Sequence, residues 1–229
     1  MMVQGVSINA LFDQSIGILK SPDGEAIKQA GQQGSMRETI IYLGVAAGIA
    51  GVVALLFGLL EGLVTPAAAL PLGLIRLLLA VVAPIGGFFI FAFILHAISK
   101  QQGGSLTQNE IIYTTALFAV PILGLNAAVG SIPKIGCVYQ PVAIGLLLYQ
   151  TYIAYLYLRT DANLIQNRAV ISAAVAGVAM IIFLITMGVI GSATGMIAGS
   201  GAVGCVSPIT VAGSVRGAEV AICPALLNF

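Results

Sequence analysis

Residues 77–98, LLLAVVAPIGGFFIFAFILHAI, form the apolar run that decides the fold of this chain. The run lies between Arg76 and Lys100 and contains no charged residue. A helix needs about 20 apolar residues to cross the hydrocarbon core of a bilayer, which is roughly 30 Å thick. The stretch therefore predicts a membrane-spanning helix.

Four further stretches have the same character, at 39–60, 111–129, 139–158 and 169–191. All five are nearly free of charge, because an ionised group at the bilayer centre costs several kcal/mol. The composition agrees with this interpretation: 59% of the 229 residues are hydrophobic and 7% are charged, whereas a soluble domain carries about 25% charged residues. We therefore expect an all-α, polytopic transmembrane helix bundle with five spans.

The charges are few and balanced, with 9 Lys and Arg against 8 Asp and Glu. This balance excludes a nucleic-acid-binding domain, which needs a basic surface. With the N-terminus inside, six basic residues are cytoplasmic and three lie on the other side; they are Lys20, Lys28, Arg37, Lys100, Arg159 and Arg168, against Arg76, Lys134 and Arg216. The positive-inside rule then predicts a cytoplasmic N-terminus and an extracytoplasmic or lumenal C-terminus. Four tyrosines at the inward helix ends are expected in the headgroup layer: Tyr42, Tyr113, Tyr155 and Tyr157.

The sequence divides into a cytoplasmic arm at 1–38, the five-helix domain at 39–191 and a glycine-rich extracytoplasmic tail at 192–229. Residues 6–19, VSINALFDQSIGIL, carry apolar side chains at helical spacing. This amphipathic segment is expected either to lie on the membrane surface or to pack on the bundle. No cleavable signal peptide is expected, because the first long apolar stretch begins only near residue 39.

The tail is interrupted by Pro208 and Pro224, which disfavours a sixth span. Cys137, Cys205 and Cys223 are all expected on the extracytoplasmic side, where a disulfide is chemically permitted. Cys205 with Cys223 is the candidate pair, since it closes a small loop; three unpaired buried thiols are the alternative.

Helix association in lipid depends on small residues that allow close backbone approach. Such residues recur at spacings of four, at Gly44 and Gly48, at Gly58 and Gly62, at Ala169, Ala173 and Gly177, and at Gly191, Gly195 and Gly199. Proline and glycine are also expected to interrupt the second span at 84–87 and the third span at 121–124. Broken helices of this kind are typical of transporter binding sites, although proline and glycine are also common in ordinary membrane helices.

Five polar residues within the spans are candidate functional groups: His96, Asn126, Gln150, Tyr149 and Tyr152. His96 is the only histidine, so a histidine zinc cluster or a Ser-His-Asp triad is not readily assembled. The residue is either a titratable group or a polar anchor at the interface. The amides are expected to bond between helices, and the tyrosine hydroxyls need partners. We expect no catalytic site, no metal and no cofactor.

Several short motifs occur in a recognisable order: residues 18–22 (ILKSP) before the first span, residues 88–96 (FFIFAFILH), residues 103–105 (GGS), and residues 113–121 and 159–163 (RTDAN) around the later spans. In this order the chain resembles the Yip-one family, the Ypt/Rab-interacting five-span membrane proteins, in its prokaryotic form, over about residues 11–190. The resemblance implies an integral membrane adaptor without enzymatic activity. Eukaryotic members have a longer acidic and glycine-rich cytoplasmic arm that is missing here, which argues against binding of prenylated Rab-type GTPases.

Taken together, we expect a non-enzymatic scaffold that binds other membrane proteins or organises the local bilayer. Two alternatives stay open. One is a small transporter or channel that uses the breaks in the second and third spans, around His96 and Asn126. The other is an accessory subunit of a large membrane complex.

Overall fold

The computed structural model describes residues 2–3, 6–32, 34–62, 66–132, 135–160 and 164–197. Within these ranges the chain forms two short strands and seven helices. They are β1 (Met2–Val3), β2 (Val6–Ser7), α1 (Ile8–Lys20), α2 (Gly24–Gln32), α3 (Met36–Gly62), α4 (Pro66–Gln101), α5 (Gln108–Gly130), α6 (Ile135–Thr160) and α7 (Gln166–Ile197). The strands form a two-residue antiparallel pairing, in which Met2 lies opposite Ser7.

Five of the helices are long and apolar enough to span a membrane, which confirms the predicted fold class. The spanning segments are Met36–Leu60, Gly73–Gln101, Gln108–Gly130, Val138–Thr160 and Gln166–Ile190. Each contains the corresponding predicted stretch, apart from the last residue of the fifth. The second helix is longer than expected, because α4 continues through Arg76 and begins at Pro66. Proline is favoured at a first helical position, where its missing N–H costs nothing.

The expected breaks in the second and third spans are absent. Helix α4 is continuous through Pro84 and the two following glycines, and α5 is continuous through Pro121. Unpaired backbone polar groups are costly in hydrocarbon. A membrane helix therefore stays helical through a proline, and groups on neighbouring helices or nearby side chains satisfy the carbonyl that the proline leaves unpaired. The sequence pattern of Pro and Gly therefore did not predict a break here.

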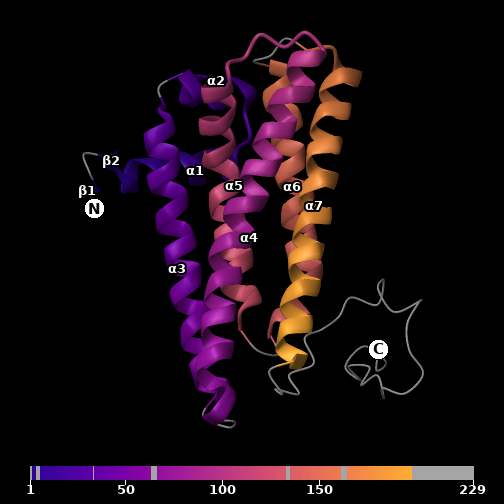
Figure 1. Ribbon diagram of the computed structural model, residues 1–229. Helices are drawn as coiled ribbons and strands as arrows, with labels where there is room; N and C mark the ends of the chain where they lie inside the picture. Colours follow the sequence, from indigo (N-terminus) through magenta and orange to yellow (C-terminus); the bar gives the residue numbers. More distant parts are fainter. Residues whose placement is uncertain are drawn as a thin grey trace, which may run out of the picture.

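Helix α5 lies at the centre of the bundle. It contacts α3, α4 and α6 as well as α1 and α2, and α4 and α7 pack together on one side (Figure 1). All ten residues from Ile111 to Val120 are buried. The first half of α5 is therefore the core of the protein.

The chain enters α5 through a well-defined turn and cap. Gly103 has φ +93°, a left-handed conformation that glycine adopts without steric cost, and it ends α4. Thr107 and Glu110 then form a capping box at the start of α5. Across the same end of the bundle, Arg168 Nη1 at the start of α7 donates to the carbonyl oxygen of Gln102 at 2.9 Å. These contacts fix the connections at the end of the bundle that carries α2.

Small residues form the packing seam of α3. Ala47, Ala50, Gly51, Ala54 and Gly58 are buried along one side of the helix. A Cβ added at Gly58 would lie 2.8 Å from the Cα of Gly73 on α4. The predicted pair of Gly44 and Gly48 is exposed instead and contributes nothing to this seam.

The predicted small face on α7 is confirmed over its described part. Ala169, Ala173 and Gly177 are all buried. A Cβ added at Gly177 would lie 2.6 Å from the hydroxyl of Thr151 on α6. Small residues therefore allow α6 and α7 to approach closely, as they do for α3 and α4.

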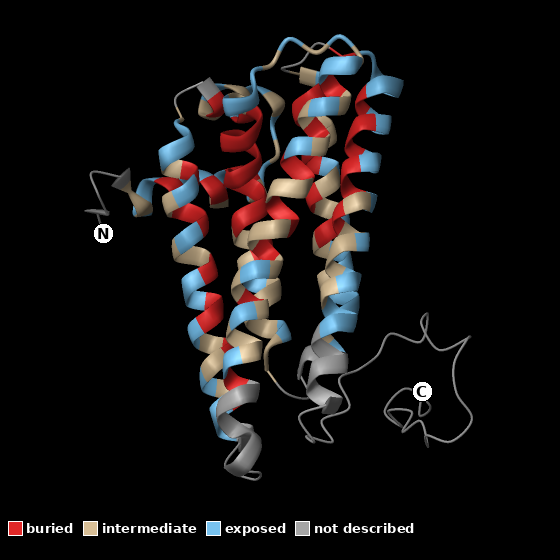
Figure 2. Ribbon diagram, viewed as in Figure 1, coloured by how far each residue is buried: buried red, intermediate tan, exposed pale blue. Residues whose placement is uncertain are grey.

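Burial is unequal along the bundle. Buried residues gather in the half next to α1 and α2, whereas the other half is mostly intermediate or exposed (Figure 2). No residue of 138–146 on α6 or of 181–190 on α7 is buried. The bundle is tightly packed at one end and open toward the other.

The contrast between two glycines on α3 gives a test of the packing seam. Gly58→Ala is expected to destabilise the protein by about 1–3 kcal/mol, because the new methyl group meets the backbone of α4. Gly48→Ala has nothing within 4 Å and is expected to stabilise the helix by about 0.5–1 kcal/mol. Thermal unfolding in detergent measures both effects. Equal effects of the two substitutions would show that α3 packs on α4 through another face.

Candidate functional site

The N-terminal helix α1 packs on the bundle, so the second of the two expectations for residues 6–19 is the one observed. Leu11, Ser15 and Ile18 are buried on its inner side, while Phe12 is 50% exposed on the other side. Ser7 caps the helix by accepting a hydrogen bond from the backbone N–H of Ala10. Figure 1 shows α1 beside the bundle and α2 at the end where α3 begins.

Three tyrosines from three spanning helices hold α1 in place. Tyr42 on α3 donates its hydroxyl to Ser15 at 3.0 Å, and Tyr149 on α6 donates to the carbonyl oxygen of Leu19 at 2.7 Å. Tyr113 on α5 donates to the side chain of Gln14 at the longer distance of 3.5 Å. The carbonyl of Leu19 lies in the last turn of α1, where backbone oxygens lack partners within the helix. We call Tyr42, Tyr113 and Tyr149 the docking tyrosines.

The structure corrects the expected role of the tyrosines at this end. Tyr42, Tyr113 and Tyr157 are buried rather than placed in the headgroup layer. Only Tyr155 is partly exposed, and its hydroxyl accepts a hydrogen bond from Arg159. These tyrosines are buried because α1 and α2 cover the ends of α3, α5 and α6. The prediction considered the spanning helices alone and left this cover out.

Helix α2 was missed by the sequence analysis. Its one fully buried hydrophobic residue is Ile27, too weak a signal to distinguish a nine-residue polar helix from a loop. The segment fits closely because Gly24 lies against Thr160 of α6 and Gly31 lies against Thr114 of α5. Residues 21–23 form the turn between α1 and α2, in which the N–H of Asp23 donates to the carbonyl of Ser21 at 2.8 Å.

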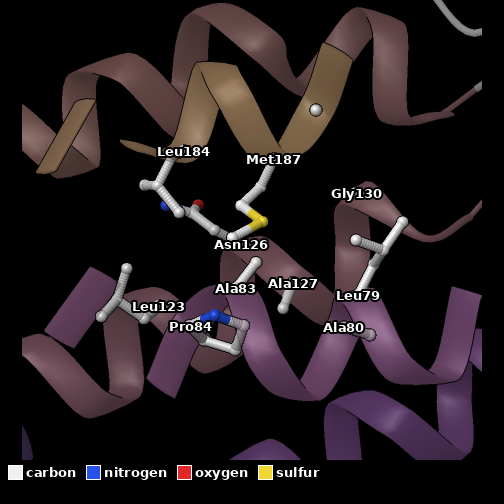
Figure 3. A pocket seen from close by; sticks show the side chains of 11 residues that line it. Leu79, Ala80, Ala83, Pro84, Leu123, Asn126, Ala127, Gly130, Leu184 and Met187 are labelled. Carbon is white, nitrogen blue, oxygen red and sulfur yellow. The ribbon is translucent and has the colours of Figure 1, made fainter. Parts of the chain in front are cut away.

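His96 and Asn126 are not brought together. His96 lies on α4 twelve residues after Pro84, a distance of about 18 Å along the helix axis. Asn126, by contrast, lies beside Pro84 in a cavity of about 320 Å³ between α4, α5 and α7 (Figure 3). Because His96 and Asn126 lie on different helices, their positions in the sequence did not indicate how far apart they are in the structure.

Gln150 is fully buried at the contact of α6 with α7. Its amide nitrogen donates to the sulfur of Met180 at 3.5 Å, and its oxygen Oε1 has no hydrogen-bond partner. The expected bond between helices is therefore present but weak, because a thioether is a poor acceptor.

A ladder of tyrosines runs along α6. The rings of Tyr149 and Tyr152 stack at 6.4 Å between centroids, and those of Tyr152 and Tyr155 lie 6.3 Å apart. The outer two hydroxyls have partners within the chain, Leu19 and Arg159. The hydroxyl of Tyr152 makes no hydrogen bond to any residue that the structure describes, and the side chain is 50% exposed.

The residues that the structure describes contain no cluster of three or more His, Cys, Asp or Glu side chains that could hold a metal. Cys205 and Cys223 lie outside the described residues, as do Gly199 and all of the tail beyond Ile197. The polar groups of the spanning helices in the described part include amides, hydroxyls and the imidazole of His96, whose Nδ1 is buried without a hydrogen-bond partner.

Removing a docking hydroxyl tests how α1 is held. Tyr42→Phe is expected to cost about 1–3 kcal/mol of stability, because it leaves the buried hydroxyl of Ser15 without its partner. Tyr149→Phe is also expected to lower the stability, because it removes the hydrogen bond to the carbonyl oxygen of Leu19 in the last turn of α1. Hydrogen exchange of residues 8–20 should become faster in both variants. Tyr152→Phe is the matched control and should leave that exchange unchanged; a similar acceleration there would contradict the assignment.

Gln150 offers a second test, of the buried unpaired oxygen. Methionine has a volume similar to that of glutamine, and Gln150→Met removes an oxygen that makes no hydrogen bond. The free energy of unfolding should therefore change by less than about 1.5 kcal/mol. Gln150→Ala leaves a cavity and should cost about 2–5 kcal/mol. Thermal unfolding in detergent compares the two. If Met were as damaging as Ala, the amide oxygen would have a bound partner, such as a water molecule.

Comparisons with protein-family models, with curated proteins and with solved structures found no match to this chain.

Proposed function

We propose that this protein is a non-enzymatic membrane scaffold that binds another membrane protein through the outer face of α6. Tyr152 is the observation that carries the proposal. The residue lies eight positions before the end of α6 at Thr160, which is about 12 Å along the axis. The interfacial layer on each side of the hydrocarbon is only about 5–7 Å thick.

The direction of the side chain strengthens this argument. Side chains on a helix tilt toward its N-terminus, and α6 begins at the opposite end of the bundle from α2. The phenol of Tyr152 is thus directed away from the near interface and deeper into the hydrocarbon. Lipid tails offer no acceptor at that depth, and an unpaired hydroxyl there is unfavourable. A carbonyl or side-chain acceptor on a neighbouring membrane helix would satisfy it.

The packing of the α2 half of the bundle favours a scaffold over a transporter. Phe88, Phe91 and Phe118 are fully buried in its core, and α1 and α2 cover α5 and α6. A transport path would need a continuous polar route through this region, where all ten residues from Ile111 to Val120 are buried. A scaffold needs only a stable bundle with an available face.

The proposal includes a cytoplasmic N-terminus and membership of a Yip-like group. Five of the six basic residues of the positive-inside count belong to α2 or to the nearby ends of α3, α4, α6 and α7, and Lys20 ends α1. This concentration of positive charge supports cytoplasmic exposure of that end. The motifs shared with the Yip-one family support a role in membrane organisation or trafficking, and an accessory subunit of a larger complex is one form that such a scaffold takes.

Tyr152→Phe tests the proposal, because the substitution removes one hydroxyl and keeps the ring. The tagged full-length chain is cross-linked in its native membrane, solubilised in mild detergent and purified with its bound partner. A single hydrogen bond between membrane helices is worth about 0.6 kcal/mol on average, so partner recovery should fall by about threefold.

Tyr149→Phe is the matched control on the same helix. Its hydroxyl is already used within the chain, so that variant should loosen α1 and retain the partner. A wild-type chain that is recovered alone and monomeric after cross-linking would contradict the scaffold proposal. Equal partner recovery with Tyr152→Phe would contradict the role of α6.

A further inference from the structure

The cavity between α4, α5 and α7 lies in the open half of the bundle, away from α1 and α2. Its volume is about 320 Å³, at the lower end of the range for ligand pockets. The walls are almost entirely apolar: Leu79, Ala83, Pro84, Leu123, Leu184 and Met187 are among the lining residues (Figure 3). Such a cavity does not hold water well, and its lining atoms lose contacts if it stays empty.

Asn126 supplies the hydrogen-bonding group of this cavity. Its oxygen Oδ1 accepts a hydrogen bond from the hydroxyl of Tyr139 at 2.9 Å, which fixes the orientation of the amide. Its amide nitrogen has no acceptor among the described residues, and Figure 3 shows the amide among the lining side chains, near Leu184 of α7. The cavity thus presents a hydrogen-bond donor on an otherwise apolar wall.

The depth of Asn126 narrows the choice of ligand. The residue lies four positions before the end of α5 at Gly130, which is about 6 Å along the axis. Because α5 is about 34 Å long and the hydrocarbon core is about 30 Å thick, Asn126 lies a few ångströms inside the hydrocarbon boundary, close to the ester groups of glycerolipids in the interfacial layer. The cavity extends about one helical turn from Asn126 toward the bilayer centre, where Leu123, Pro84 and Leu184 line its inner end, and about one turn the other way, to Gly130.

We propose that this cavity binds a glycerolipid, with one acyl chain between α4, α5 and α7 and its ester carbonyl accepting a hydrogen bond from the Asn126 amide. The inference goes beyond the scaffold function and involves a different face of the molecule from Tyr152. It accounts for the apolar lining, for the single oriented donor and for the depth at which that donor lies. Residues 198–229 of this chain and a second copy of the protein are the competing occupants.

Photo-cross-linking from Met187 tests the proposal on the full-length protein. The chain is produced with photo-methionine, a diazirine analogue of methionine, and placed in phosphatidylcholine vesicles. Illumination followed by peptide mass spectrometry then identifies what is attached at Met187. We expect phosphatidylcholine adducts there. Adducts to residues 198–229, or to a second copy of the chain, in place of lipid would overturn the proposal.

A comparison of two lipids tests the hydrogen bond to the ester. Ether-linked phosphatidylcholine has the same chains and headgroup and lacks the carbonyl groups. One hydrogen bond is worth about 0.5–1.5 kcal/mol, so the wild-type adduct yield at Met187 should be about two- to twelvefold higher with the ester lipid at subsaturating lipid in mixed micelles. Asn126→Leu should bring this ratio close to one. A ratio of one in the wild-type protein would overturn the assigned contact, and this measurement needs no variant.

A substitution that fills the cavity distinguishes labelling by lipid inside it from labelling by bulk lipid at the outer surface of α7. Ala83→Leu should lower the Met187 adducts with both lipids by several-fold, because the larger side chain occupies the space for the acyl chain. Ala97→Leu is the matched control, since this alanine lies on α4 and is exposed. Unchanged adduct yield in a correctly folded Ala83→Leu protein would mean that the labelling comes from bulk lipid, and would overturn the cavity assignment.

Discussion

Lipid offers the spanning helices neither hydrogen bonds nor a hydrophobic drive to associate, and the packing of this protein follows from that constraint. Helices α3 and α4 meet where Gly58 lies against Gly73, and α6 meets α7 where Gly177 lies against Thr151. Both contacts replace side-chain bulk with close backbone approach, which increases dispersion contacts between helices. The same constraint keeps α4 and α5 helical through their prolines, since a break exposed to hydrocarbon would leave backbone groups unpaired.

The two ends of the bundle differ in how far the chain covers its own spanning helices. Near α2, the chain covers its own helices: α1 and α2 bury α5, and the docking tyrosines direct their hydroxyls inward to α1. Toward the opposite end, α6 and α7 have no buried residue over 138–146 and 181–190. At the first end the docking tyrosines find their acceptors within the chain, whereas at the second end the amide nitrogen of Asn126 has no acceptor among the described residues. This difference explains why the cavity with Asn126 lies in the open half.

The sequence predicted the spans because the relevant signal, about 20 apolar residues between charges, is local to each helix. It did not predict which glycines pack. Gly48 and Gly58 have the same spacing pattern to a neighbouring glycine, and the first is exposed while the second meets α4. Which side of an apolar helix faces another helix is decided by tertiary contacts, and a uniformly apolar segment carries little periodic signal for it. Helix α2 and the contacts of the docking tyrosines with α1 were missed for the same reason, since both depend on residues more than 25 positions away.

Tyr149 and Tyr152 show how little residue identity alone says about function. They lie three positions apart on α6, their rings stack, and from the sequence both hydroxyls need a partner. One hydroxyl ends on the carbonyl of Leu19 and holds the N-terminal helix; the other faces outward with no partner in the described chain. Asn126 provides the same contrast within one side chain, because its oxygen is bonded to Tyr139 and its nitrogen faces an apolar cavity. In a medium without hydrogen-bonding groups, a polar atom that faces outward or into a cavity without a partner indicates where another molecule can bind.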